Sequence, residues 1–429
     1  MVKRLQIIFL IFFSINTFAG IKIEKLFDGK NQVTGYVIVN KFFKAVLVDP
    51  GQVEAENYGE DVCRGGWFRD IILKNTKKNL LGECRIPGGE FRFGLAQIFE
   101  PTITIPADDK VQPADMVTGG GKIKQSKDGR INISEVFPWK TSVEEETGKI
   151  VVSFSQDATL SNDFAYKMRI DLTFTDSASV TVKGIFFNTG QKEFTANICL
   201  APVFENPYED TAWITVPHLD ARKQEDKRIN IISKNPILVK ELGKEYLFNE
   251  SRLSKANRWV AAGGLTGNAV FAFLGELPID KVAFWKNAQC FSLKPYINIT
   301  AAPGVRTEWK WNVIFGRGLN RVSKVTDKGI FAFYAEQGSN VSERLLKMDF
   351  MPLSELNGLF LDSTVKTMTG RMIMTKSSEM IKISPLQPGV ITLKLPDHIK
   401  KDNNYLLKLE LFSGDNLFYE MTEAFSPEL

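Results

Sequence analysis

Short stretches in which hydrophobic and polar residues alternate dominate the chain. The clearest is "VRTEWKWNVIF" (305–315), where apolar positions recur at every second residue. Its apolar face consists of Val305, Thr307, Trp309, Trp311, Val313 and Phe315. A period of two is typical of a β-strand that buries one face. We therefore expect Trp309 and Trp311 to fill a core rather than a binding site.

Further strands are predicted from similar runs, and turn-forming clusters separate them. Examples are "KIVVSFSQ", "MRIDLTFTD", "SVTVKGIFF" and "FTANICLAPVF", with "TDSAS" and "NTGQKE" as turns. Convincing long helical periods are absent from the sequence. Regularly spaced strands without helices between them indicate antiparallel sheets, so the fold class is all-β, a sandwich or a barrel.

The pattern changes near Val325, where the strands become shorter and aromatic residues fewer. In "GVITLKLPDHIKKDNNYLLKLELF" two alternating runs flank a polar loop. The apolar positions of these runs are Ile391, Leu393, Leu395, Leu407, Leu409 and Leu411. The size of this region suits a small immunoglobulin-like sandwich. We predict one large β domain over 20–325 and a small β-sandwich over 326–429.

The first nineteen residues have the organisation of a secretory signal peptide. Lys3 and Arg4 precede the apolar run "LQIIFLIFF", and small residues end at Ala19. That order predicts cleavage after Ala19 and a secreted or periplasmic protein. Nothing after Gly20 extends the apolar run, so no membrane span is expected in the mature chain.

The charge and the cysteine content limit the kinds of partner, disulfide and metal site that the sequence predicts. Loss of Lys3 and Arg4 changes the formal net charge from +4 to +2, and the remaining charges are interspersed. This argues against nucleic acid as a partner. The four cysteines permit two disulfides in an exported chain, or four buried thiols. With two distant histidines and no Cys-x-x-Cys, no metal or cofactor is predicted.

A polar and aromatic cluster follows the apolar strand "NICLAPVF". Its members are Glu205, Tyr208, Glu209, Asp210, Trp213 and His218. Such residues line binding sites, but a solvated loop after a strand has the same composition. His218 suits a proton-transfer role, yet a loop histidine with a backbone partner is the simpler interpretation.

Several segments, in their order, resemble the galactose-mutarotase-like (aldose 1-epimerase-like) superfamily. They are "NYGEDVCRGGWFRDIILKN", "FRFGLAQIFEP", "TGGGKIKQSKDGRINISEVFPW", "FAYKMRIDLTFTDSASVTVKGIFFNTGQKEFTANICLAPVF" and "KPYINITAAPGVRTEWKWNVIF". Together they cover about Tyr58 to Phe315. The resemblance implies a β-supersandwich of two large antiparallel sheets whose concave face binds a carbohydrate, a mono- or polysaccharide. Fold alone does not settle function.

The family's catalytic pair is a His at the end of the strand here reading "ICLAPVF" and a Glu at the strand here reading "KPYINI". Those positions carry Ala201 or Pro202 and Lys294. This departure puts ordinary epimerase chemistry in doubt. Glu205 and His218 are the candidate replacements. We therefore expect a carbohydrate-binding protein. The alternatives are an enzyme with a replaced pair (a polysaccharide lyase, an atypical epimerase or a glycosidase) and a structural surface protein.

The resemblance also implies where a sugar would lie, between the end of "ICLAPVF" and the start of "KPYINI". The candidate carbohydrate-binding residues are Arg64, Trp67, Glu205, Tyr208, Glu209, Trp213, Lys294 and Tyr296. Arg64 is either a donor to the ligand or an exposed strand-edge residue. Proximity in the inferred fold favours the disulfide pairings Cys63–Cys84 and Cys199–Cys290.

Overall fold

The structure is a computed structural model. It describes residues 20–28, 31–52, 62–74, 76, 78–85, 91–101, 116–118, 121–125, 131–159, 163–205, 211–219, 232–233, 235–248, 253, 257–338, 343–380, 382–397, 399 and 403–425. The backbone alone is described at 62–64, 83–85, 91–93, 100–101, 116–118, 121–125, 131–136, 218–219, 232–233, 380 and 425. The predicted signal peptide lies outside the described residues.

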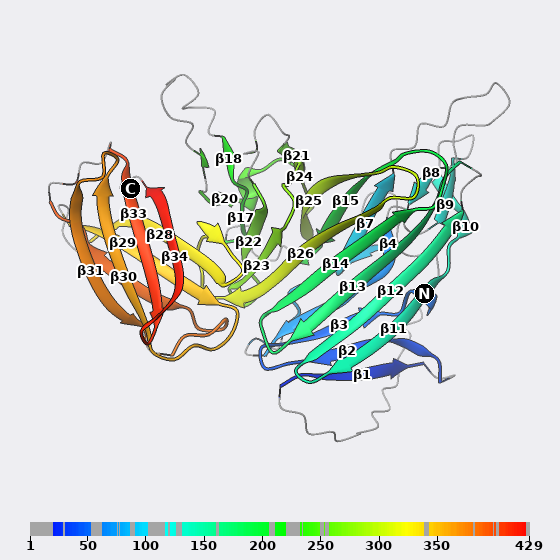
Figure 1. The fold of residues 1–429 in the computed structure, drawn as a ribbon, viewed down its shortest axis with the longest axis horizontal. Helices are drawn as coiled ribbons and strands as arrows, with labels where there is room; N and C mark the ends of the chain where they lie inside the picture. Colours follow the sequence, from blue (N-terminus) through cyan, green and yellow to red (C-terminus); the bar gives the residue numbers. More distant parts are fainter. Residues whose placement is uncertain are drawn as a thin grey trace.

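The described chain is built from β-strands, and its regular helical segments are the short 3₁₀ turns η1 (Pro50–Gln52) and η4 (Val239–Glu241). The prediction of an all-β fold with antiparallel sheets is confirmed. Two large sheets face each other in the region before residue 324, and a smaller pair of sheets follows (Figure 1).

The first large sheet has ten strands in the order β1-β2-β3-β4-β7-β15-β25-β24-β21, with β16 paired to β25. Its strands are β1 Lys22–Phe27, β2 Val33–Val39, β3 Phe43–Val48, β4 Val62–Leu73, β7 Leu95–Pro101, β15 Phe194–Pro202, β16 Phe204–Glu205, β21 Glu245–Phe248, β24 Lys281–Lys286 and β25 Cys290–Ala301.

The second large sheet has nine strands in the order β11-β12-β13-β14-β26-β23-β22-β17-β20. Its strands are β11 Trp139–Glu146, β12 Lys149–Thr159, β13 Ala165–Thr175, β14 Ser179–Asn188, β17 Trp213–Thr215, β20 Ile237–Leu238, β22 Trp259–Leu265, β23 Ala269–Gly275 and β26 Arg306–Arg317. Three minor sheets comprise β5 Glu83–Arg85 with β6 Phe91–Phe93, β8 Met116–Thr118 with β9 Gly121–Gln125 and β10 Ile131–Val136, and β18 His218–Leu219 with β19 Ile232–Ser233.

The facing sides of the two large sheets form one aromatic-rich core. Phe99 from the ten-stranded sheet packs 5.6 Å, ring centre to ring centre, from Phe186 of the nine-stranded sheet. Trp309 and Trp311 are buried in the same core, as their alternation predicts. Trp309 lies across Gly184, where a Cβ would come 2.0 Å from the ring, so the glycine makes room for the indole.

The last part of the chain forms a small sandwich of two four-stranded sheets. One contains β27 Lys324–Val325, β28 Gly329–Gln337, β29 Arg344–Pro352 and β32 Gly389–Lys394. The other contains β30 Leu359–Thr367, β31 Met372–Met380, β33 Tyr405–Ser413 and β34 Asn416–Phe425. The predicted apolar rows 391–395 and 407–411 both lie in its core. The domain boundary at 325/326 stays a prediction, although pairing within the small sandwich begins at Lys324.

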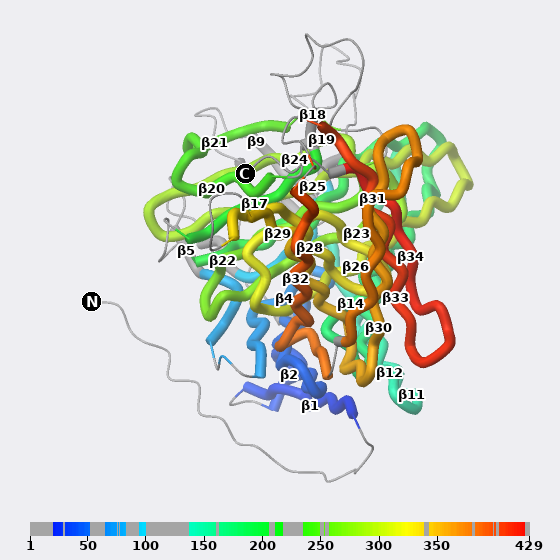
Figure 2. Tube along the Cα trace, turned by 90° about the vertical axis from the view of Figure 1, so that its left-hand side faces the viewer, coloured from blue at the N-terminus to red at the C-terminus, as the bar shows by residue number. Residues whose placement is uncertain are grey.

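The small sandwich packs against the nine-stranded sheet. Figure 2 views the molecule from the side of the small sandwich. Met351 joins Trp213 and Trp259 in a shared cluster, and Gly316 leaves room for the Met351 sulfur. The backbone N–H of Ala178 donates to the carbonyl of Leu353 at 2.7 Å. One end of the outer face of the nine-stranded sheet is therefore buried between the domains.

Candidate functional site

The pairing of β15 with β25 brings together the two strand ends that the sequence singles out. Cys199 of β15 lies opposite Tyr296 of β25, and the strands are antiparallel. The end of β15 therefore meets the start of β25, and the same register puts Ala201 beside Lys294. These are the two positions that the resemblance assigns to the catalytic pair, and they lie next to each other in the sheet.

The first row of side chains across the outer face of this sheet is large and buried. Ile98, Cys199 and Tyr296 form a cluster there, and Tyr296 is 6% exposed. The ammonium of Lys281 lies 4.4 Å from the centre of the Tyr296 ring, a cation–π contact. This row thus combines an apolar wall with one cation.

The next row, toward the end of β15, is made of small side chains. Ala96 pairs with Ala201, and Ala283 pairs with Lys294. Alanine contributes one methyl group above the sheet, so this row is lower than the row of Tyr296. Lys294 is half-buried and stands among the three alanines. Ala96 and Ala201 are 5% and 8% exposed, so neighbouring groups cover most of this row, and one ammonium stands next to it.

Two further rows complete the outer face toward β16. Ser292 lies opposite Trp285, and Cys290 lies opposite Glu205. Ser292 is 2% exposed, and its hydroxyl has no hydrogen-bond partner among the described residues. A buried hydroxyl without a partner is unfavourable, because it has lost its water. Glu205 is exposed, and its Cα is about 14 Å from that of Lys294, four residues along a strand.

The two predicted tryptophans lie in different places. Trp67 of β4 is 2% exposed, and its indole nitrogen lies over Gly94, the residue before β7. Trp213 belongs to the other large sheet and is buried under the small sandwich. The structure therefore does not bring Trp213 together with Lys294 and Glu205, because β17 pairs with β22 of the nine-stranded sheet.

The other predicted site residues cannot be compared in the same way. The side chains of Arg64 and His218 and the whole of Tyr208 and Glu209 lie outside the described residues. Their roles stay predictions. The backbone of Arg64 is part of β4, which neighbours β7 in the ten-stranded sheet.

The predicted disulfide pairings are wrong. Cys290 is disulfide-bonded, whereas Cys199 is a buried thiol outside any disulfide. The reason is distance along β25, because Cys199 lies opposite Tyr296, six residues or about 20 Å from Cys290. A disulfide needs Cα atoms within about 7 Å. By elimination, Cys290 pairs with Cys63 or Cys84, which also rules out a Cys63–Cys84 bond.

Two searches within the described residues bear on other site types. No group of three or more His, Cys, Asp or Glu side chains is arranged to hold a metal ion in that part of the chain. Nor does any helix among those residues have the length and apolarity that crossing a membrane would require.

Solved structures similar to this chain match it with TM-scores below 0.5 and at low sequence identity. The Slr1438 protein of Synechocystis sp. PCC 6803 has a TM-score of 0.45 and 11% identity, over 72% of this chain and 100% of that one. A galactose mutarotase-like protein of Lactobacillus casei ATCC 334 has 0.42 and 13%, over 66% and 99%. Galactose 1-epimerase of Lactobacillus acidophilus NCFM has 0.42 and 9%, over 70% and 100%.

Two of these three structures carry names of the superfamily that the sequence resembles. No family model matches the chain, and no curated protein matches it in sequence.

Sequence reasoning missed the residues that shape the floor and far side of this face. Ala96 and Ala283 attract no attention as candidates for chemistry, and Ala201 stands out only as a position where the family has its catalytic His. Trp285 has a signal, because in "KVAFWK" it has the opposite parity to the core residues Val282 and Phe284. Parity marks it as outward-facing, but the position of β24 beside β25 is a fact of topology.

Proposed function

We propose that the chain is an exported carbohydrate-binding protein whose ligand lies on the outer face of the ten-stranded sheet, over the row of alanines beside Lys294. The observation that carries the proposal is the combination of that low row with a half-buried ammonium and the buried Ser292 hydroxyl. Sites for small polar ligands combine apolar walls with a few polar groups that converge on the ligand.

Each group has a role in this proposal. The Lys294 ammonium and the Ser292 hydroxyl donate hydrogen bonds to sugar hydroxyls. Tyr296 and Trp285 supply the apolar walls on either side of the alanines. The Ser292 hydroxyl is buried without a partner among the described residues, so a ligand would satisfy it once the groups that cover it move aside.

Binding rather than ordinary epimerase catalysis is proposed because of the residues at the two family positions. Mutarotation moves one proton to the ring oxygen and takes another from the anomeric hydroxyl. Ala201 has no group that transfers a proton, and Lys294 is a cation instead of a carboxylate.

The test is calorimetric titration with a panel of mono- and oligosaccharides, neutral and acidic, on the native protein and on Lys294→Met. We expect at least one ligand whose affinity falls about tenfold or more in Lys294→Met, the loss expected for a hydrogen bond from a charged group. Ser292→Ala should weaken the same ligand by a smaller factor.

The matched control is Lys44→Met, because Lys44 is an exposed residue of β3 in the same sheet, away from β25. Its affinity should equal that of the native protein. Equal affinity of Lys294→Met and the native protein for every ligand would refute the proposed site. Polarimetry with glucose and galactose should show no enzyme-like mutarotation.

A further inference from the structure

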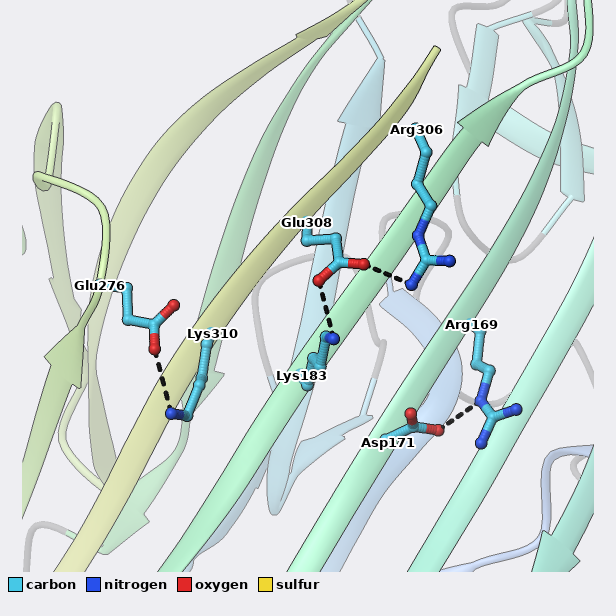
Figure 3. A network of polar contacts seen from close by, with 7 residues as sticks. All are labelled: Arg169, Asp171, Lys183, Glu276, Arg306, Glu308 and Lys310. Carbon is cyan, nitrogen blue, oxygen red and sulfur yellow. Dashed lines mark hydrogen bonds and ion pairs between the residues drawn. The ribbon is translucent and has the colours of Figure 1, made fainter. Parts of the chain in front are cut away.

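The outer face of the nine-stranded sheet carries a hollow of about 490 Å³ at the end that the small sandwich leaves uncovered. Its walls come from strands β11, β12, β13, β14 and β26 and from Glu276, the residue after β23 (Figure 3). This volume is in the range of ligand sites in proteins. The hollow lies on the opposite side of the large sandwich from the site proposed above.

The floor of the hollow is one row of small or short side chains. Val151 pairs with Thr173, and Thr173 pairs with Thr181. The Thr181 hydroxyl donates to Asn312 Oδ1 at 2.8 Å, just outside the hollow. Glu144 of β11 continues the row beyond Val151. Within the hollow the row crosses four strands, so it is about 14 Å long at the usual strand spacing. The floor therefore has the shape of a trough across the strands.

Ion pairs border this trough. The Arg169 guanidinium donates to Asp171 at 2.7 Å and to the Ser153 hydroxyl at 3.0 Å. Lys183 is 2.7 Å from Glu308, and Lys310 is 3.0 Å from Glu276 (Figure 3). Each of these charged groups thus faces a partner of opposite charge before any ligand arrives.

These contacts also hold the groups in their charged forms. The hydrogen bond to Asp171 raises the pKa of Arg169. The hydrogen bond from Lys183 lowers the pKa of Glu308. The hollow has four cationic and four anionic residues, so opposite charges alternate and balance. A polyanion or a polycation would meet as much repulsion as attraction there.

We propose that this trough binds a neutral, hydroxyl-rich chain, an oligosaccharide of uncharged sugars, lying along the row of Thr173 and Thr181. Each sugar hydroxyl both donates and accepts, so it uses an ammonium on one side and a carboxylate on the other. The ion pairs preorganise these donors and acceptors, which lowers the cost of ordering side chains on binding. The site is separate from the one that contains Lys294.

The test uses calorimetric titration of the full protein with oligosaccharides of glucose, xylose and mannose, and with polygalacturonate as an acidic probe. One variant combines Lys183→Met with Glu308→Gln, which removes a wall pair. A second combines Thr173→Val with Thr181→Val, which removes the floor hydroxyls at nearly equal volume. Both should lower the affinity for a neutral oligosaccharide about tenfold or more, the loss of one good hydrogen bond to a charged group or of several neutral ones.

The matched control combines Lys167→Met with Asp157→Asn. This pair lies 4.0 Å apart on β13 and β12 of the same sheet, outside the hollow. It should bind like the native protein. The two hollow variants should leave unchanged the affinity for any ligand that depends on Lys294 alone, which separates the two sites.

Three outcomes would overturn the proposal: no neutral oligosaccharide binds, both hollow variants bind like the native protein, or polygalacturonate alone depends on the hollow. Loss of binding in Lys294→Met with no loss in the hollow variants would favour the other face and refute this one. Circular dichroism and melting curves show whether each variant is folded. The Thr173 and Thr181 variant keeps the ion pairs and tests the site if the wall variant does not fold.

Discussion

The two outer faces of the large sandwich differ in the way their side chains meet water. On the ten-stranded sheet Tyr296, Ser292 and Cys199 are buried, although they point away from the main core. On the nine-stranded sheet Lys183 and Glu308 keep about 40% of their side-chain surface exposed. Both faces follow the same alternation along their strands. Alternation therefore tells which residues point outward, and it does not tell whether an outward face is buried.

The difference in burial between the two outer faces changes which ligand contacts each face can make. A buried outward face can hold an unsatisfied hydroxyl such as that of Ser292, where a hydrogen bond to a ligand is worth more than in water. An exposed face can hold many charges at little cost, because water and ion pairs satisfy them. One face is suited to a few strong contacts and the other to many weak ones.

The largest expected effect tests the burial of the first face. Tyr296→Ala removes a 6% exposed ring from its contacts with Ile98 and Cys199. The lost burial and the resulting cavity should cost about 3–5 kcal/mol of unfolding free energy. Urea denaturation followed by fluorescence measures it. Lys183→Ala, on the exposed face, is the reference and should cost less than about 1 kcal/mol. Similar costs for the two variants would erase the distinction between the faces.

A covalent bond also distinguishes the first face. Cys290 is disulfide-bonded to Cys63 or Cys84, and β5, which contains Cys84, contacts β16 beside Cys290. We therefore expect the Cys84–Cys290 bond. Cys290→Ser should lower the unfolding free energy by about 2–4 kcal/mol.

Peptide mapping checks this pairing directly. Denatured but unreduced protein should react with iodoacetamide at two cysteines, Cys199 and Cys63. Labelling of Cys84 in place of Cys63 would assign the bond to Cys63. Labelling of all four cysteines would show that the bond does not form under the conditions of purification.

The strands of the large core could be predicted from the sequence because each carries its own signal. Trp309 and Trp311 alternate with charged residues, and both are buried in the core as expected. The rows 391–395 and 407–411 reach the small core for the same reason. Such predictions need a period of two and no knowledge of which strands are neighbours.

The candidate site was predicted only in part, because it depends on which strands are neighbours in a sheet. The meeting of Lys294 with the end of β15 came from the resemblance, and the register agrees with it. Trp213 follows the same strand by about a dozen residues, yet the chain has crossed to the other sheet by then. The prediction of the disulfide pairing was wrong for a similar reason. Knowing that two cysteines lie on neighbouring strands does not tell how far apart they are along those strands. The trough had no motif at all, since its residues come from five strands.

The small sandwich has a third outward face, on which Asp349 of β29 lies. Asp349 tests whether burial on this face also leaves a polar group without water. Met348 and Phe350 face the small core, so Asp349 points outward, yet it is 6% exposed. Burial raises its pKa from 3.8 to about 6, against the opposing effects of Lys347 and Arg321. The folded state then binds more protons than the unfolded state between these values, so stability falls as the pH rises through them.

Asp349→Asn removes that dependence. At pH 8 the variant should be more stable than the native protein by up to about 3 kcal/mol, and below about pH 4 the difference should vanish. Urea denaturation at both pH values measures it. Asp415→Asn, a change in an exposed turn, is the control and should give the same small difference at each pH. A gain for Asp349→Asn that is equal at pH 4 and pH 8 would contradict the assignment to ionisation.

The smallest expected effect concerns the exposed face itself. The pair Lys183–Glu308 joins β14 to β26, and Glu308 also binds Arg306 (Figure 3). Because these side chains are well exposed, water replaces most of the lost attraction. A double-mutant cycle with Lys183→Met and Glu308→Gln should therefore give a coupling close to the error of the measurement. Raising the salt concentration should reduce the coupling further, since ions screen exposed charges.

A large coupling that resists salt would mean that this face is as desolvated as that of Tyr296. The charges would then be structural, and a trough preorganised for hydroxyls would be the wrong description. A small, salt-sensitive coupling leaves the charged groups available to a ligand at little cost to the fold.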